Sequence, residues 1–282
     1  RRLPITTCYR SAMLRPLFLL VVLAGCNSDP RDEPSTPPPS GELVRLSLIT
    51  DRARVAPGED LDLVARLEIA DGWHVYWQNP GEAGLPTKAS FTAPAGFTVG
   101  EVAYPGPESF RSPGGIVTFG YVKETALFAR VRAPQEAVPN AVFSVNASWL
   151  ACRENCVRGK AVATLSLPTD APAATRTAAV EALRDRLPRP WTELGVEPAW
   201  SYADGEMRLE LALTGVSSVE LFPLDDGGVR IFGQSVRHEA GRAVIQTRFS
   251  TDEPAKPALR GALRVDRAGR IRYYAVDIPW PC

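Results

Sequence analysis

Short stretches in which hydrophobic and polar residues alternate recur from residue 42 onward, with turn-forming residues between them. Alternation with a period of two is typical of a strand that has one buried face. Before residue 169 these stretches are Glu42–Thr50, Leu61–Ile69, Trp73–Trp77, Ile116–Tyr121, Ala126–Val131, Val142–Leu150 and Ala161–Leu167. The turn signals are Pro57-Gly58, Asn79-Pro80-Gly81, Pro105-Gly106 and Pro113-Gly114-Gly115. This pattern predicts an antiparallel β-sandwich.

A different pattern follows at Thr169–Leu187, where Ala is frequent and Val180, Leu183 and Leu187 stand at helical spacing. We expect a helical linker over residues 169–191, capped by Thr169 or Asp170 and ended by Pro188 and Pro190. Alternation then resumes in Met207–Thr214, Val219–Leu224, Val229–Phe232, Ala243–Phe249, Gly261–Val265 and Arg270–Val276. The predicted fold class is therefore all-β, with sandwiches at residues 42–168 and 192–282 joined by a short helix.

Composition narrows the class of protein without changing this picture. The chain has 282 residues, of which 45% are hydrophobic, so it can bury a core. Its 26 Pro and 22 Gly disfavour long helices. Lys plus Arg and Asp plus Glu both total 32, so the chain has no basic surplus and we expect no nucleic-acid partner.

The N-terminal region resembles an export signal. Arg15 precedes an apolar run, Leu17–Ala24, which is too short to span a bilayer. Leu23-Ala24-Gly25-Cys26 is similar to a bacterial lipobox, which implies cleavage before Cys26 and lipidation of its thiol. We therefore expect a signal peptide at residues 1–25, with Met13 as the natural initiator. An ordinary cleaved signal followed by a chance Cys is the alternative.

Residues 26–41 are expected to form a tether between the lipid and the first sandwich. Asn27–Ser40 contains five Pro and no large apolar residue, and its extended length is roughly 40 Å. The first 25 residues hold four Arg and no acidic residue, so the remaining chain carries a formal charge of −4. Acyl chains on Cys26, and not charge, would then hold the protein to a membrane. By analogy with envelope lipoproteins, Asn27 in place of Asp after Cys26 points to the outer membrane, with the chain on the periplasmic side.

Cys152 and Cys156 are candidates for a disulfide, provided that Arg153-Glu154-Asn155 folds back as a turn. A loop this short stabilises a fold by about 2 kcal/mol, whereas a Cys156–Cys282 bridge would give about 5. The close pair suits exchange chemistry, because a neighbouring thiol resolves a mixed disulfide quickly. Spacing alone leaves a structural disulfide and a redox pair equally open.

The flanking charges bear on that choice. Arg153, Arg158 and Lys160 would favour a thiolate and Glu154 would oppose it. A metal site has weaker support, because His74 and His238 lie far apart in sequence and Met207 is the only Met after residue 25. We therefore expect neither a metal nor an organic cofactor. No motif of a hydrolase or a nucleotide-binding protein is visible.

Several segments resemble one protein family. Asp71–Thr87, which reads DGWHVYWQNPGEAGLPT, is similar to a tryptophan-containing segment in the periplasmic N-terminal domains of DsbD and ScsB thiol-disulfide reductases. The segment Trp149–Cys152, followed by Cys156 and Gly159, resembles the cysteine strand of that domain, and Gly120-Tyr121 its preceding pair. Leu221–Pro223 and Gly261–Leu263 resemble the second β-domain of the ScsB type.

This resemblance implies two immunoglobulin-like sandwiches, the first carrying a redox pair, Cys152 and Cys156. It also implies a shielding loop with aromatic and acidic residues, for which Glu108, Phe110 and Tyr121 are the candidates. Trp73 and Trp77 share one face of their strand and are expected in the core. We expect Cys282 to be a frayed terminal thiol.

The leading hypothesis is a thiol-disulfide interchange protein that passes electrons between a membrane reductase and periplasmic thiol proteins, a chemistry linked in this family to cytochrome c-type biogenesis. The sequence lacks the family's transmembrane and thioredoxin domains, so a separate membrane reductase or thioredoxin-like protein is the expected partner. If active, the chain would act as a protein-disulfide reductase. The alternative is a non-enzymatic binding or assembly lipoprotein with a structural disulfide.

Overall fold

The structure is a computed structural model. It describes residues 43–112, 114–136, 138, 140–168, 178–203, 205–225, 229–239, 241–251 and 258–279. The predicted signal peptide, Cys26, the tether up to residue 41, both proposed helix caps and Cys282 lie outside the described residues. All described residues belong to one compact unit bounded by Pro37 and Cys282.

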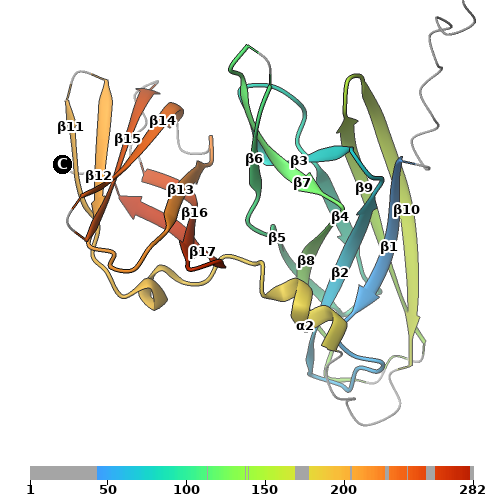
Figure 1. Cartoon of the computed structure of the whole chain (residues 1–282). Helices are drawn as coiled ribbons and strands as arrows, with labels where there is room; N and C mark the ends of the chain where they lie inside the picture. The colour runs from blue at the N-terminus through green and yellow to red at the C-terminus, as the bar shows by residue number, and fades with distance from the viewer. Residues whose placement is uncertain are drawn as a thin grey trace, which may run out of the picture. The chain divides into compact units, whose positions relative to one another are not determined.

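Two antiparallel sheets contain the strands from residue 44 to residue 167 (Figure 1). One sheet has the order β1-β2-β8-β5, and the other has the order β10-β9-β3-β7-β6 with β4 also paired to β9. The strands are β1 Val44–Thr50, β2 Asp60–Ile69, β3 His74–Gly81, β4 Lys88–Thr92, β5 Thr98–Ala103, β6 Glu108–Arg111, β7 Val117–Val122, β8 Glu124–Arg132, β9 Ala141–Cys152 and β10 Cys156–Leu167.

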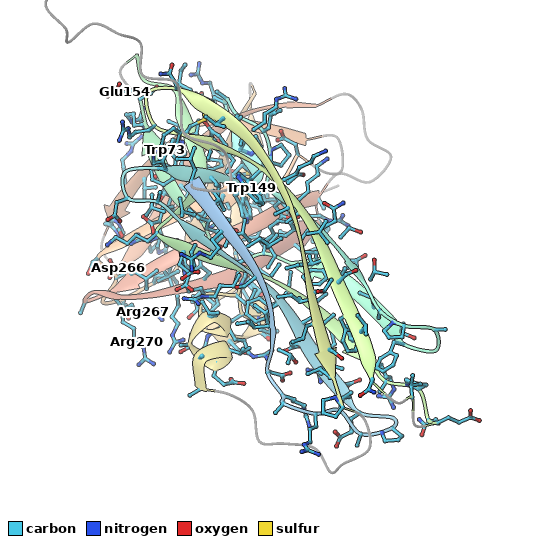
Figure 2. The ribbon with its side chains drawn as sticks, turned by 90° about the vertical axis from the view of Figure 1, so that its right-hand side faces the viewer. Trp73, Trp149, Glu154, Asp266, Arg267 and Arg270 are labelled. Atoms are coloured by element: carbon cyan, nitrogen blue, oxygen red, sulfur yellow. A yellow bond between two sulfur atoms is a disulfide. The ribbon has the colours of Figure 1, made fainter. Side chains whose placement is uncertain are left out.

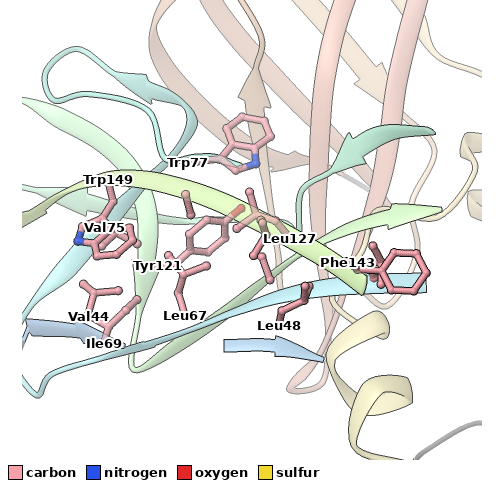
Figure 3. Packing of buried hydrophobic residues seen from close by; sticks show 14 of the residues in the cluster. Val44, Leu48, Leu67, Ile69, Val75, Trp77, Tyr121, Leu127, Phe143 and Trp149 are labelled. Atoms are coloured by element: carbon pink, nitrogen blue, oxygen red, sulfur yellow. The ribbon is translucent and has the colours of Figure 1, made fainter. Parts of the chain in front are cut away.

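The alternating side chains of these sheets form the first hydrophobic core. Trp73, Val75 and Trp77 are all buried in it, as their common strand face predicts. Tyr121 and Trp149 lie in the same cluster, and Figure 3 shows Tyr121 among aliphatic side chains that include Leu67 and Leu127. His74 and Tyr76, on the opposite face of β3, are left for the site described below.

One turn prediction is wrong. Asn79-Pro80-Gly81 does not end the strand but belongs to β3, which continues to Gly81. The pairing of β3 with β7 shifts register between Tyr76 and Gly81, so the turn-forming residues make an irregularity inside the strand. The Asn79 side chain supplies hydrogen bonds at this irregularity. Its Oδ1 accepts from the Gly81 amide at 2.9 Å, and its Nδ2 donates to the Pro223 carbonyl at 2.8 Å.

The predicted linker contains the short helix α2, Ala178–Arg184, followed by the 3-10 turn η1, Trp191–Leu194. Residues 169–177 lie outside the described part of the chain. Val180 of α2 is buried against Val64 and Phe128, so the helix packs on the outer face of β2 and β8. Arg184 forms ion pairs with Asp62 and, at 3.7 Å, with Asp51. These contacts anchor the linker to the first sandwich.

A second pair of antiparallel sheets follows, with the orders β11-β12-β15-β14 and β13-β16-β17. We call these strands the C-terminal sandwich. They are β11 Ala199–Ala203, β12 Glu206–Leu211, β13 Ser218–Pro223, β14 Val229–Glu239, β15 Arg242–Thr251, β16 Ala258–Arg267 and β17 Arg270–Pro279. Met207, Leu221, Ile245, Leu263 and Val276 from both sheets share its core. The all-β, antiparallel fold class is confirmed; the domain boundaries stay a prediction.

Among the described residues, no helix has both the length and the apolar character needed to cross a bilayer.

Candidate functional site

A disulfide joins the ends of strands β9 and β10. Cys152 and Cys156 stand directly opposite each other in the register of this hairpin, with their Cα atoms 4.1 Å apart. The Arg153 amide donates to the Asn155 carbonyl at 3.1 Å and closes the turn. Glu154 lies at the outer tip of the hairpin (Figure 2). The fold-back that pairing requires is therefore present.

The two sulfur-bearing residues differ sharply in exposure. Cys152 is only 2% exposed, whereas Cys156 is exposed. Arg158 and Lys160 are also exposed, and they follow Cys156 at alternate positions, so all three side chains share one face of β10. A thiolate on Cys156 would therefore lie near two cations. An incoming group can reach Cys156 and not its partner.

Tyr76 contacts the buried member of the pair. Its hydroxyl donates to the Cys152 sulfur at 3.3 Å. Burial raises the pKa of Tyr76, so the phenol keeps its proton and remains a donor at neutral pH. The ring is held from behind by Gly84, where a Cβ atom would lie 2.5 Å from a ring carbon. The loop after β3 thus fixes the ring that donates to the sulfur.

His74 links the disulfide to strand β6. It pairs with Cys152 in the register of β3 and β9. Its ring stacks on Phe110, with centroids 5.0 Å apart, and meets Tyr76 edge-on at 5.2 Å. Burial lowers the pKa of His74, which favours the neutral ring. Phe110 therefore lies over an aromatic pair that borders Cys152.

The other residues predicted to act on the site lie in different surroundings. Glu108 is exposed at the start of β6, and its carboxylate lies 4.0 Å from the Arg186 guanidinium. Tyr121 is fully buried in the core, where its hydroxyl donates to the Pro105 carbonyl at 2.8 Å. Arg153 lies over the ring of Trp73, 5.6 Å from its centroid. Of the predicted shielding residues, Phe110 is the one that stacks beside the site.

Sequence reasoning gave His74 and Tyr76 no role in the site. The available signal was their position on the strand face opposite Trp73 and Trp77, which leaves two ring-bearing polar residues outside the core. Their proximity to Cys152 depends on the pairing of β3 with β9, which separates the partners by 76 positions for Tyr76 and Cys152. Within the described residues, no three His, Cys, Asp or Glu side chains gather as metal ligands would.

The sandwich therefore carries a disulfide at a hairpin end, with one cysteine exposed and the other buried beside Tyr76, which is an arrangement suited to thiol-disulfide exchange. Residues 47–168 match the family described as thiol:disulfide interchange protein DsbD, N-terminal, and this part of the chain is a DsbD-type N-terminal domain. The expected family is therefore confirmed for that segment. No curated protein matches the chain.

Two solved structures extend the comparison. The N-terminal periplasmic domain of ScsB from Proteus mirabilis is 17% identical, with a TM-score of 0.58, and the match covers 84% of this chain and 92% of that one. It shows that the fold is shared across both sandwiches. The reduced DsbD N-terminal domain from Neisseria meningitidis is 16% identical with a TM-score of 0.29, covering 50% of this chain and 96% of that one. The family and the disulfide support a role in thiol-disulfide interchange.

Proposed function

We propose that this chain is an envelope thiol-disulfide exchange protein of the protein-disulfide reductase type. Cys152 and Cys156 cycle between disulfide and dithiol and pass electrons between a membrane reductase and periplasmic thiol proteins. The observation that carries the proposal is the unequal exposure of the two cysteines, one buried and one open to a partner. A disulfide with only a structural role gains nothing from such an arrangement.

The first step is attack by a partner thiolate on the Sγ atom of Cys156. A bond forms between the partner sulfur and Cys156, and the Cys152–Cys156 bond breaks, so that Cys152 leaves with the electron pair as a thiolate. The Tyr76 hydroxyl already points at this sulfur, and a hydrogen bond to a charged acceptor is stronger than one to a neutral acceptor. Tyr76 therefore stabilises the leaving group.

The second step releases the partner. A second thiolate of the partner attacks the partner sulfur of the mixed disulfide, the partner closes its own disulfide, and Cys156 leaves as a thiolate. Both cysteines of this chain take up protons from solvent. Two electrons have then moved from the partner to this chain. In the reverse direction, the Cys156 thiolate attacks an oxidised partner and Cys152 resolves the mixed disulfide.

Strand β6 covers the site between these events. Phe110, stacked on His74, shields the aromatic face next to Cys152, and Glu108 gives the strand its acidic group. Tyr121 contributes from the core, through its hydrogen bond to Pro105 three positions before Glu108. A partner thiolate can approach the exposed Cys156, whereas access from the Cys152 side requires displacement of Phe110.

The proposed location is the periplasmic side of a bacterial membrane, with the chain anchored through lipid on Cys26 in the outer membrane. A separate membrane reductase or a thioredoxin-like protein would supply or accept the electrons. The ScsB domain that shares this fold is described as periplasmic, which supports the compartment. Labelling with a radioactive fatty acid, compared between the native chain and Cys26→Ser, tests the anchor.

Single cysteine variants test the exchange. Cys152→Ser leaves Cys156 able to form a mixed disulfide that nothing within the chain resolves, so it should accumulate linked to a thioredoxin-like partner on a non-reducing gel. Cys156→Ser is the matched control and should capture little, because Cys152 is buried. Capture by neither variant contradicts exchange. A reduction potential below about −300 mV would instead place the bond among structural disulfides.

A further inference from the structure

The segment that precedes strand β6 is buried, although it is a loop. We call Pro105, Gly106 and Pro107 the cap root and β6, Glu108–Arg111, the cap strand, since Phe110 on this strand stacks on His74 beside Cys152. All three cap-root residues are buried, whereas Glu108, directly after them, is exposed. Loops normally run over the surface, so the burial of this one requires partners for its backbone.

Two of the three partners come from outside the sheets of the first sandwich. The Tyr273 hydroxyl, on β17 of the C-terminal sandwich, donates to the Pro107 carbonyl at 2.8 Å. The Gly106 amide donates to the Arg186 carbonyl of the linker at 2.9 Å. From the first sandwich, Tyr121 donates to the Pro105 carbonyl. Each residue of the cap root thus has one backbone group bonded to a different part of the chain.

The Tyr273 ring also packs tightly against the backbone of the cap root. A Cβ atom added to Gly106 would lie 1.9 Å from a ring carbon of Tyr273, so the ring packs directly on the backbone at this position. Tyr273 is itself buried, and burial raises the pKa of its phenol, which therefore keeps its donor proton. A buried donor against a buried carbonyl is a fixed attachment, because neither group can exchange its partner for water.

Residues of the linker also contact the first sandwich and β17 next to the cap root. The guanidinium of Arg186 donates to the Glu124 carbonyl at 3.0 Å and lies 4.0 Å from the Glu108 carboxylate. The backbone at Arg189 also bonds to β17, since its amide donates to the Tyr273 carbonyl at 2.8 Å. The linker and β17 are therefore bonded to each other, and each of them is also bonded to the cap root.

The cap strand connects the cap root to the residues that border the disulfide. Phe110 lies three positions after Pro107, and β6 is held to β7 through Glu108–Gly120 and Phe110–Thr118 pairs. Phe110 stacks on His74, which pairs with Cys152. A displacement of the cap root therefore moves the residue that covers the site.

We propose that the C-terminal sandwich is a clamp for the cap strand, and that Tyr273 is a positioning residue that keeps Phe110 over His74. The inference rests on the proposed function, in which Phe110 shields the pair. With the root fixed, Phe110 rarely leaves His74, so the approach to the disulfide from the Cys152 side stays closed and only the exposed Cys156 side is open. A partner protein opens the site by binding to the cap strand itself.

The test is the rate at which dithiothreitol reduces the disulfide in the full chain. Tyr273→Phe keeps the ring and removes the hydrogen bond, so the cap should open more often and the second-order rate constant should rise about threefold or more. Tyr274→Phe is the matched control, since Tyr274 is a neighbouring buried tyrosine in the core of the C-terminal sandwich, and it should leave the rate unchanged. Thermal unfolding of both variants verifies that they are folded.

Phe110→Ala makes the test specific. This variant removes the shield, so adding Tyr273→Phe to it should give no further increase in rate. A wild-type rate for Tyr273→Phe overturns the clamp, and so does an increase that persists in the Phe110→Ala background. Hydrogen exchange at the β6 amides, faster in Tyr273→Phe than in the native chain, is the second measurement. Because dithiothreitol needs no protein partner, the reduction rates can be interpreted even if the single cysteine variants capture no partner.

Discussion

The hydroxyl of Tyr76 donates to the sulfur of Cys152 across 3.3 Å, on the face of β3 opposite the core and beside the hairpin that carries both cysteines. The donor comes from β3 and the acceptor from β9, so the contact depends on the pairing of these strands. It gives the buried sulfur a partner that favours its negatively charged form.

Replacing Tyr76 by Phe should therefore slow exchange. A hydrogen bond to a charged acceptor contributes about 1.5–3 kcal/mol, so its loss on the leaving sulfur should slow thiolate attack by about tenfold or more. Stopped-flow tryptophan fluorescence during reduction by dithiothreitol measures the rate. Tyr274→Phe again serves as the control, and a Tyr76→Phe rate within twofold of the native one would rule out this role.

The loop glycine behind Tyr76 offers a second prediction. At Gly84, φ is +110° and a Cβ would collide with the Tyr76 ring, so Gly84→Ala should destabilise the fold by about 1–3 kcal/mol and slow exchange as well. Gly114 has a φ of +105° and open space around its Cα. Gly114→Ala carries the backbone strain alone and should leave the rate of exchange unchanged. Urea unfolding and the dithiothreitol assay separate the two effects.

His74 should make stability depend on pH. Its folded pKa lies below the usual 6.5 because of burial, so the unfolded chain binds a proton more readily than the folded one. The contribution of His74 is fully present above pH 6.5 and is lost as the pH falls from there towards the folded pKa. In His74→Phe, the midpoint of urea unfolding should therefore change less with pH below 6.5 than it does in the native chain. An unchanged acid slope in that variant contradicts the assignment; His238→Phe controls for loss of an imidazole.

The ion pairs under α2 should be costly to break. Arg184→Met removes the cation that the buried carboxylates of Asp51 and Asp62 share, while Asp62 keeps its pair with Arg130, so the loss should be about 3 kcal/mol, at the lower end for a broken buried ion pair. Arg132→Met removes a cation from the exposed pair with Asp60, which is worth about 1 kcal/mol or less. Urea unfolding compares the two, and equal losses would show that burial of the pair is not the cause.

The sequence predicts the buried strands well and the edges poorly. β2, β8 and β9 are largely buried and rich in apolar residues, and the predicted segments fall within them; β9 alternates clearly, whereas β2 and β8 are buried on both faces where α2 packs. β4, β5, β6 and β11 are not among the strands that the sequence pattern predicts. β5 is mostly exposed and β6 has four residues, of which only Phe110 is apolar, so neither shows a local pattern. β4 pairs with β9 and β5 with β8, which are distant in sequence, whereas β6 and β11 each pair with the next strand.

In the site, too, local features are predicted from the sequence and contacts between distant residues are not. The turn chemistry of Arg153–Asn155 is local, and the sequence predicts that Cys152 and Cys156 can meet. The contacts of Tyr76 with Cys152, and of Tyr273 with Pro107, join residues 76 and 166 positions apart. Composition and spacing carry no information about such pairs, because they arise only when the sheets assemble.

Cys152 and Cys156 face each other in a hairpin whose ladder continues for twelve matched positions to Ala141 and Leu167. The backbone hydrogen bonds of that ladder, and not the sulfur bridge, hold the two strands together. Reducing the bridge should therefore leave the hairpin and its sheet in place. Under the proposed function, the chain could then be reduced and reoxidised repeatedly without unfolding.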